Sequence, residues 1–147
     1  MAAFSETVLV QAPIDTVWAL VSDIRRTAGL FSYMTITDYV TLAPGHWQFQ
    51  RTLAIPSVAT LSWCEQATVK AEGELHFHAI DGDLPYFAGL WLVAADDAGT
   101  RLTLALDYEP PTNVGPRVPA SMAQYVIGEI FKSVCRHIKE AAEETAR

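Results

Sequence analysis

The C-terminal part of the chain constrains the fold more than any other segment, because it predicts one long amphipathic helix. After a proline-rich loop at Pro110–Pro119, apolar residues recur at intervals of three and four as far as about Glu144, which is helical spacing. A single helix cannot bury such a stripe by itself, so the rest of the chain must cover it. The stripe consists of Ala123, Ile127, Ile130, Phe131, Val134, Ile138 and Ala141.

Most of the preceding chain predicts strands joined by short turns. Helical spacing follows Pro13 as far as Ile24, and a short second helix is expected to include Leu30 and Phe31. Turn signals such as Pro44-Gly45, Pro56-Ser57 and Asp81-Gly82-Asp83 separate the later strands and imply antiparallel hairpins. The seven predicted strands are Phe4–Val10, Tyr33–Leu42, His46–Leu53, Ala59–Ala71, Glu74–Ile80, Phe87–Ala95 and Arg101–Glu109.

These elements predict an α+β fold in a single domain spanning residues 1–147. Its curved antiparallel sheet of about seven strands wraps around the long C-terminal helix, and two short helices follow the first strand.

Two ionisable residues occupy positions that should be apolar. Alternation along the predicted strands places Arg51 on the same face as Trp47 and Phe49, and Glu65 on the same face as Trp63. Burying a charge is costly unless it is paired or faces water. We therefore expect either an internal ion pair that fixes the register of the strands or a cavity whose ligand needs polar anchors.

The composition excludes several function classes. The chain of 147 residues is 50% hydrophobic and carries a net charge of −7, which disfavours nucleic acids and anionic membranes as partners. The longest charge-free stretch, Thr52–Cys64, is too short to span a bilayer, and the N-terminus lacks a signal-peptide pattern. We expect a cytoplasmic monomer or homodimer without an integral membrane segment.

The sequence provides no reason to expect a metal or another cofactor. Cys64 and Cys135 have no zinc-like spacing and are expected to be free thiols. Glu74, His76 and His78 share one strand face and could hold a metal. However, the apolar residues of that strand occupy the other face, so the histidines should face solvent.

Three segments resemble the helix-grip fold of the START / Bet v 1-like (SRPBCC) superfamily, and in particular its polyketide cyclase/dehydrase-like family. They are Ala12–Ile24 (APIDTVWALVSDI), the strand-turn-strand piece from Leu75 through DGD to FAGLWL, and Gly99–Leu104 (GTRLTL). The resemblance implies a cavity between the sheet and the long helix. It says less about activity, because the fold hosts carriers, lipid binders, cyclases and protein-interaction domains.

The aromatase/cyclase branch of this superfamily looks similar between Asp23 and Phe31 and around Trp63. That branch typically has a tryptophan where this chain has Thr27, and an arginine where it has Ala67. Hairpin geometry places Arg51 opposite Trp63 and diagonal to Glu65, so Arg51 could supply a cation from the neighbouring strand.

Two functions fit this pattern, and the sequence leaves open whether the chain is catalytic. It binds a polyketide-, quinone- or lipid-like molecule as a carrier, or it cyclises or dehydrates a polyketide-type intermediate; a protein-interaction module of the same fold is a third class. The candidate catalytic residues are Glu65, Arg51 and Tyr108, and the candidate ligand-binding residues are Trp47, Phe49, Trp63, Trp91, Leu104 and Tyr125.

Overall fold

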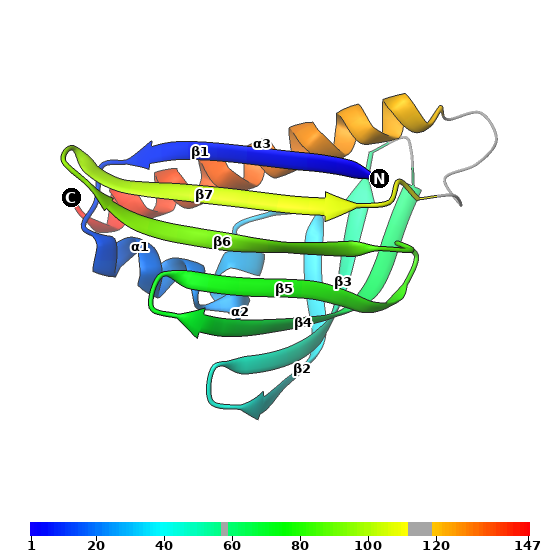
Figure 1. Cartoon of the computed structure of the whole chain (residues 1–147), viewed down its shortest axis with the longest axis horizontal. Helices are drawn as coiled ribbons and strands as arrows, with labels where there is room; N and C mark the ends of the chain where they lie inside the picture. The colour runs from blue at the N-terminus through cyan, green and yellow to red at the C-terminus, as the bar shows by residue number, and fades with distance from the viewer. Residues whose placement is uncertain (57–58, 112–118) are drawn as a thin grey trace.

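The computed structural model describes residues 1–56, 59–111 and 119–147 and confirms the predicted α+β fold. One antiparallel sheet has the strand order β1-β7-β6-β5-β4-β3-β2 (Figure 1). The elements are β1 (Ala2–Val10), α1 (Ile14–Val21), α2 (Ile24–Ala28), β2 (Met34–Ala43), β3 (His46–Ile55), β4 (Ala59–Ala71), β5 (Glu74–Gly82), β6 (Phe87–Asp96), β7 (Gly99–Tyr108) and α3 (Ala120–Thr145).

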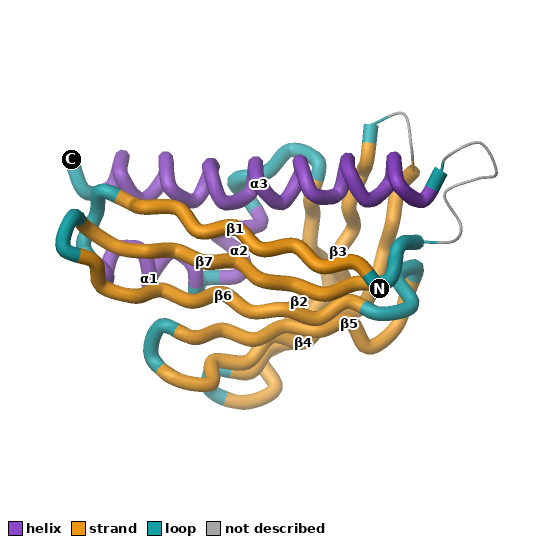
Figure 2. The backbone as a smooth tube through the Cα atoms, turned by 45° about the horizontal axis from the view of Figure 1, so that its top comes forward, coloured by secondary structure: helices purple, strands orange, loops and turns teal. Residues whose placement is uncertain are grey.

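The sheet curls around α3, as the apolar stripe of this helix requires. Figure 2 shows α3 lying along β1, while β2 and β3 turn toward the N-terminal half of the helix. The predicted stripe is buried from Ala123 to Ile138, and Ala142 continues it in place of Ala141, which is only partly covered. Phe131 joins the helix to the sheet through ring contacts with Phe4 and Phe87, both at 6.0 Å between centroids.

The second short helix lies earlier in the chain than expected. The sequence predicts that it includes Leu30 and Phe31, whereas α2 ends at Ala28. The reason is local: the side chain of Asp23 caps the new helix by accepting a hydrogen bond from the backbone N–H of Arg26. The helical spacing that runs to Ile24 therefore belongs to two helices, and the connection 29–33 carries Phe31 toward the interior.

Two predicted turns fall partly outside the described residues. The turn at Pro56-Ser57 includes positions 57–58, and the proline-rich loop Pro110–Pro119 includes positions 112–118. On either side of the first, β3 and β4 pair from Ile55↔Ala59 to His46↔Thr68, so the antiparallel hairpin itself is confirmed. Among the described helices, none is both long and apolar enough to cross a membrane.

A bulge between β4 and β5 shapes the sheet beside Glu65. Trp63 pairs with Gly82 but Glu65 pairs with Ala79, so β5 carries one extra residue here. Gly82 has φ +130°, and a Cβ at this position would lie 2.4 Å from the Cα of Trp63. Only glycine fits both the backbone conformation and the close approach of the two strands.

Replacing Gly82 by alanine should therefore destabilise the fold by roughly 2–4 kcal/mol, since it adds backbone strain and a steric clash. The matched control is Gly128→Ala in α3. Its added Cβ would lie 3.9 Å from the Phe4 ring, which is an ordinary contact. Because alanine is the better helix former, this variant should gain roughly 0.5–1 kcal/mol. Urea denaturation measures both, and equal stability of the two variants would contradict the conclusion that only glycine fits at position 82.

Candidate functional site

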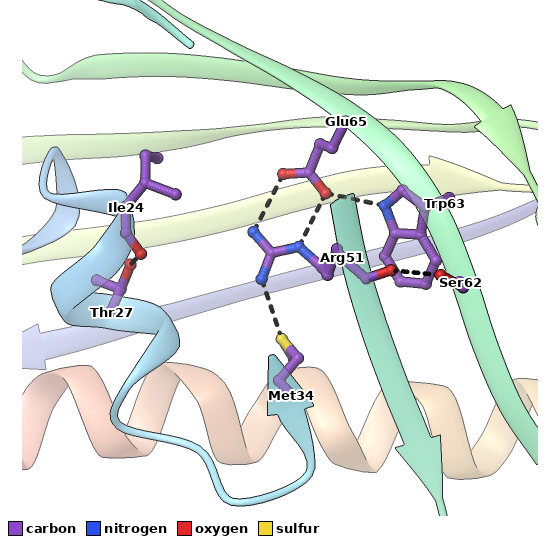
Figure 3. A network of polar contacts seen from close by, with 7 residues as sticks. All are labelled: Ile24, Thr27, Met34, Arg51, Ser62, Trp63 and Glu65. Carbon is purple, nitrogen blue, oxygen red and sulfur yellow. Dashed lines mark hydrogen bonds and ion pairs between the residues drawn. The ribbon is translucent and has the colours of Figure 1, made fainter. Parts of the chain in front are cut away.

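Arg51 and Glu65 form a bidentate ion pair on the concave face of the sheet. Arg51 Nε donates to Glu65 Oε1 at 3.0 Å, and Nη2 donates to Oε2 at 3.1 Å (Figure 3). The indole N–H of Trp63 donates to the same Oε1 at 2.9 Å. Three N–H donors thus converge on a group that, when ionised, only accepts hydrogen bonds. The side chain of Glu65 is 4% exposed and that of Arg51 is 17% exposed.

The register of β3 and β4 produces this pair, which the sequence allowed but left undecided. Arg51 lies opposite Trp63, and Phe49 lies opposite Glu65, so the guanidinium reaches the carboxylate diagonally. The carbon of the guanidinium lies 5.1 Å from the centre of the Phe49 ring. Phe49 itself stacks on Tyr39 at 6.4 Å. The guanidinium is therefore held at one edge by Glu65 and packed against an aromatic ring.

The other edge of the guanidinium is only weakly engaged. Arg51 Nη1 donates to the thioether sulfur of Met34 at 3.2 Å. A thioether is a poor acceptor compared with any oxygen. Of the five N–H groups of Arg51, two have no acceptor in the described part of the chain. This edge can therefore donate to an oxygen atom of a bound molecule.

The pair borders a small apolar cavity between the concave face of the sheet and the three helices. Its volume is about 60 Å³, which is room for a few water molecules. Arg51 and Glu65 are the only charged groups among the described residues that line it. The lining residues are Val21, Ile24, Thr27, Ala28, Phe31, Met34, Arg51, Trp63, Glu65, Ala67, Leu75, Phe77, Phe87, Trp91, Leu104, Phe131, Val134 and Ile138.

A ring-sized ligand needs a larger cavity, so side chains must move to admit one. Among the lining residues, Phe31 lies on the connection between α2 and β2, and Ala28 and Met34 flank it. Phe31 packs edge-on against His137 of α3, with ring centres 5.5 Å apart. Tyr33 donates a hydrogen bond to Ser133 Oγ at 3.0 Å. These contacts hold the connection against α3 over one side of the cavity.

Three of the six predicted ligand-binding residues line this cavity: Trp63, Trp91 and Leu104. The inward face of β6, which the sequence left undecided, is the face of Phe87 and Trp91; Leu92 on the other face is 39% exposed. Phe49 is buried beneath the guanidinium, and Trp47 is partly buried, but neither lines the cavity.

Tyr108 and Tyr125 lie away from the cavity, contrary to expectation. Tyr108 is buried, but its hydroxyl donates to the carbonyl of Gln124 in α3 at 3.4 Å, and burial raises its pKa. It sits at the end of β7, where the N-terminal half of α3 covers the sheet. Tyr125 is 68% exposed because it lies off the buried stripe of α3.

The sequence interpretation missed several lining residues. Met34 and Phe31 line the cavity because α2 ends earlier than the sequence predicted. The only sequence signal for Met34 was its alternation with Ile36 along the predicted strand, which puts both side chains on one face. Thr27 and Ala67, where the aromatase/cyclase branch typically has tryptophan and arginine, both line the cavity. The comparison of those two positions was therefore a useful signal for the location of the site.

The remaining reactive residues lie elsewhere. His78 is exposed, and His76 contacts Glu74 at 2.6 Å on the outer face of β5. In the described ranges, no three or more histidines, cysteines or acidic residues are grouped to hold a metal ion. Cys64 and Cys135 are free thiols, as predicted. Burial raises the pKa of both thiols, that of Cys135 to about 12, so neither is an activated nucleophile.

Comparison with known proteins agrees with this geometry. The model of a family described as "Polyketide cyclase / dehydrase and lipid transport" matches residues 1–143. The chain belongs to this family. No curated protein sequence is significantly similar to it.

Solved structures show the same helix-grip, START-like fold. TTHA0849 from Thermus thermophilus aligns with a TM-score of 0.86 at 17% identity, covering 99% of this chain and 100% of that one. The Zhui aromatase/cyclase from a Streptomyces species gives 0.80 at 16% identity, covering 99% and 96%. A START superfamily protein from Mycobacterium smegmatis gives 0.75 at 20% identity, covering 97% and 98%.

The ion pair itself can be tested by stability. Arg51→Met should cost about 3 kcal/mol, because it leaves the buried carboxylate of Glu65 without its cation. The double variant Arg51→Met/Glu65→Met should recover to within about 1 kcal/mol of the parent chain, since apolar groups then replace both charges. Chemical denaturation measures the free energy of unfolding of the parent chain and of both variants. A double variant no more stable than Arg51→Met would show that the two side chains are not paired.

Proposed function

We propose that this protein binds an apolar small molecule, polyketide-, quinone- or lipid-like, in the cavity between the sheet and α3. Arg51 anchors the polar group of the ligand, and Glu65 positions Arg51. The observation that carries the proposal is the guanidinium edge that borders an apolar cavity and has only the sulfur of Met34 as its acceptor among the described residues. A pair that served only to fix strand register would have no need of such an edge.

The shape and chemistry of the lining favour a flat or extended apolar ligand. The rings of Trp63, Phe77 and Phe131 surround that of Phe87 between the sheet and α3, with centres 5.2–6.0 Å from it. Aromatic walls of this kind bury a large apolar area while the few polar groups fix orientation. The family description and the aromatase/cyclase and START neighbours support the same ligand class.

A cyclase or dehydratase activity at the same site is the second candidate. Here Arg51 would donate to a substrate carbonyl and stabilise the negative charge that develops on its oxygen during enolisation. The sequence predicts that Glu65 exchanges a proton with the substrate, and this stays a prediction. Its two oxygens already accept three hydrogen bonds, which favours a positioning role. A carrier needs only the anchor, whereas a cyclase also needs a route for the proton.

Blocking the cavity should abolish binding of a neutral apolar fluorophore, N-phenyl-1-naphthylamine. Ala67→Phe projects a ring into the cavity and should weaken the binding at least about tenfold, as expected when ligand and side chain compete for one space. Thr68→Phe is the matched control, because the neighbouring residue of β4 lies on the outer face. Fluorescence titration measures both after circular dichroism has verified folding. Equal affinities would place the probe outside the cavity.

Glu65→Gln separates the carrier from the enzyme. For a carrier, the affinity for N-phenyl-1-naphthylamine should change by less than about threefold, because the probe has no oxygen to be anchored. For proton transfer through Glu65, turnover of a poly-β-ketone substrate should fall about 10²- to 10⁴-fold. Binding and turnover assays on the same Glu65→Gln preparation distinguish the carrier from the enzyme. Full turnover in Glu65→Gln would remove Glu65 from any catalytic role.

A further inference from the structure

We propose that the cavity selects ligands whose polar group is a neutral carbonyl oxygen, as in a ketone, quinone or ester, and rejects carboxylates such as free fatty acids. This inference rests on the proposed function and names the ligand class of the same site. It follows from the charge balance of the Arg51–Glu65 pair and from the donors that the cavity offers.

The charge of Arg51 is already compensated inside the protein. Both oxygens of Glu65 accept from the guanidinium, at 3.0 and 3.1 Å, and the carboxylate is almost completely buried. A ligand carboxylate at the other edge of the guanidinium would place two negative charges around one cation. In a water-excluded site such an extra charge is poorly tolerated, because like charges repel and desolvation is not repaid.

The described lining of the cavity provides no second cation to compensate a carboxylate. No other charged group occurs among the described lining residues. Arg25 and Arg26 of α2, which are next to lining residues in the sequence, engage other partners. The guanidinium of Arg25 lies 4.4 Å from the Tyr39 ring, and Arg26 donates to Thr145. An anionic head group would therefore leave the site with one full negative charge uncompensated.

The other polar groups of the lining are also used. The Trp63 indole N–H donates to Glu65 at 2.9 Å. The Thr27 hydroxyl lies 3.1 Å from the Asp23 carbonyl and 3.0 Å from the Ile24 carbonyl, to which it donates. Among the described lining residues, the free edge of Arg51 is therefore the hydrogen-bond donor that remains available to a ligand. The N–H groups of Arg51 can donate to a carbonyl oxygen, but its single positive charge is already balanced by Glu65 and is not available to balance a carboxylate.

Met34 marks where that oxygen binds. Its thioether sulfur accepts a hydrogen bond from Arg51 Nη1 at 3.2 Å. Methionine side chains are flexible, and their sulfur is a weak hydrogen-bond acceptor. A carbonyl oxygen that replaces the sulfur makes the stronger hydrogen bond. The displaced side chain of Met34 also yields space in the cavity beside Arg51.

Three ligands of nearly equal size test the selection: 2-acetylnaphthalene, 2-naphthoate and 2-ethylnaphthalene, titrated at neutral pH by tryptophan fluorescence. The ketone should bind at least about tenfold more tightly than the carboxylate, which is the cost of an uncompensated buried charge. It should also bind more tightly than the hydrocarbon, by the value of one hydrogen bond to a charged donor.

Glu65→Gln should reverse the order of ketone and carboxylate, because Arg51 then lacks its internal anion and prefers a ligand that supplies one. Exposed Arg101, on the outer face of β7, is the control: Arg101→Gln should keep the order of the parent chain. If Glu65→Gln does not fold, Arg51→Met/Glu65→Met serves instead, and it should lose the preference of the ketone over the hydrocarbon.

The outcomes distinguish this inference from the proposed function. Carboxylate binding equal to or tighter than ketone binding in the parent chain would overturn the inference while the cavity stands as a binding site. Failure of all three ligands, with N-phenyl-1-naphthylamine still bound, would overturn it as well. Failure of all four probes would overturn the proposed function too.

Discussion

The covering of the apolar face of α3 is the constraint on which the rest of the structure depends. The stripe from Ala123 to Ile138 must be removed from water, and a flat sheet would touch only part of it. The sheet therefore curls, and the bulge opposite Glu65 helps it bend. The helix and the curved sheet meet through the rings of Phe131 and Phe87, and a small cavity remains between them.

The Arg51–Glu65 ion pair lies in this interior, and its two charges cancel. A lone arginine or glutamate on the concave face would be costly, and the bidentate geometry with Trp63 removes most of that cost. What remains is a guanidinium edge, held rigidly and directed at the cavity. Such an arrangement suits recognition of a single oxygen atom on an otherwise apolar ligand.

The sequence predicted the fold and the inward positions of Arg51 and Glu65 for specific reasons. Period-two alternation put Arg51 and Glu65 on inward faces, and the short hairpin put them within reach of each other. Alternation could not decide β6, since Leu90 and Trp91 are both apolar, nor could it show that the Tyr108 hydroxyl turns to α3. Met34 and Phe31 were missed because the sequence placed the second helix too late: Asp23 caps its start, and α2 ends at Ala28, before both residues.

The central claim is that the free edge of Arg51 receives an oxygen of a ligand bound between the sheet and α3. A crystal structure of the complex with 2-acetylnaphthalene tests it most directly. We expect the carbonyl oxygen within hydrogen-bonding distance of Arg51 Nη1, the Arg51–Glu65 pair intact and the sulfur of Met34 displaced. A ligand bound on the outer face of the sheet, or inside the cavity with its oxygen turned away from Arg51, would contradict the account.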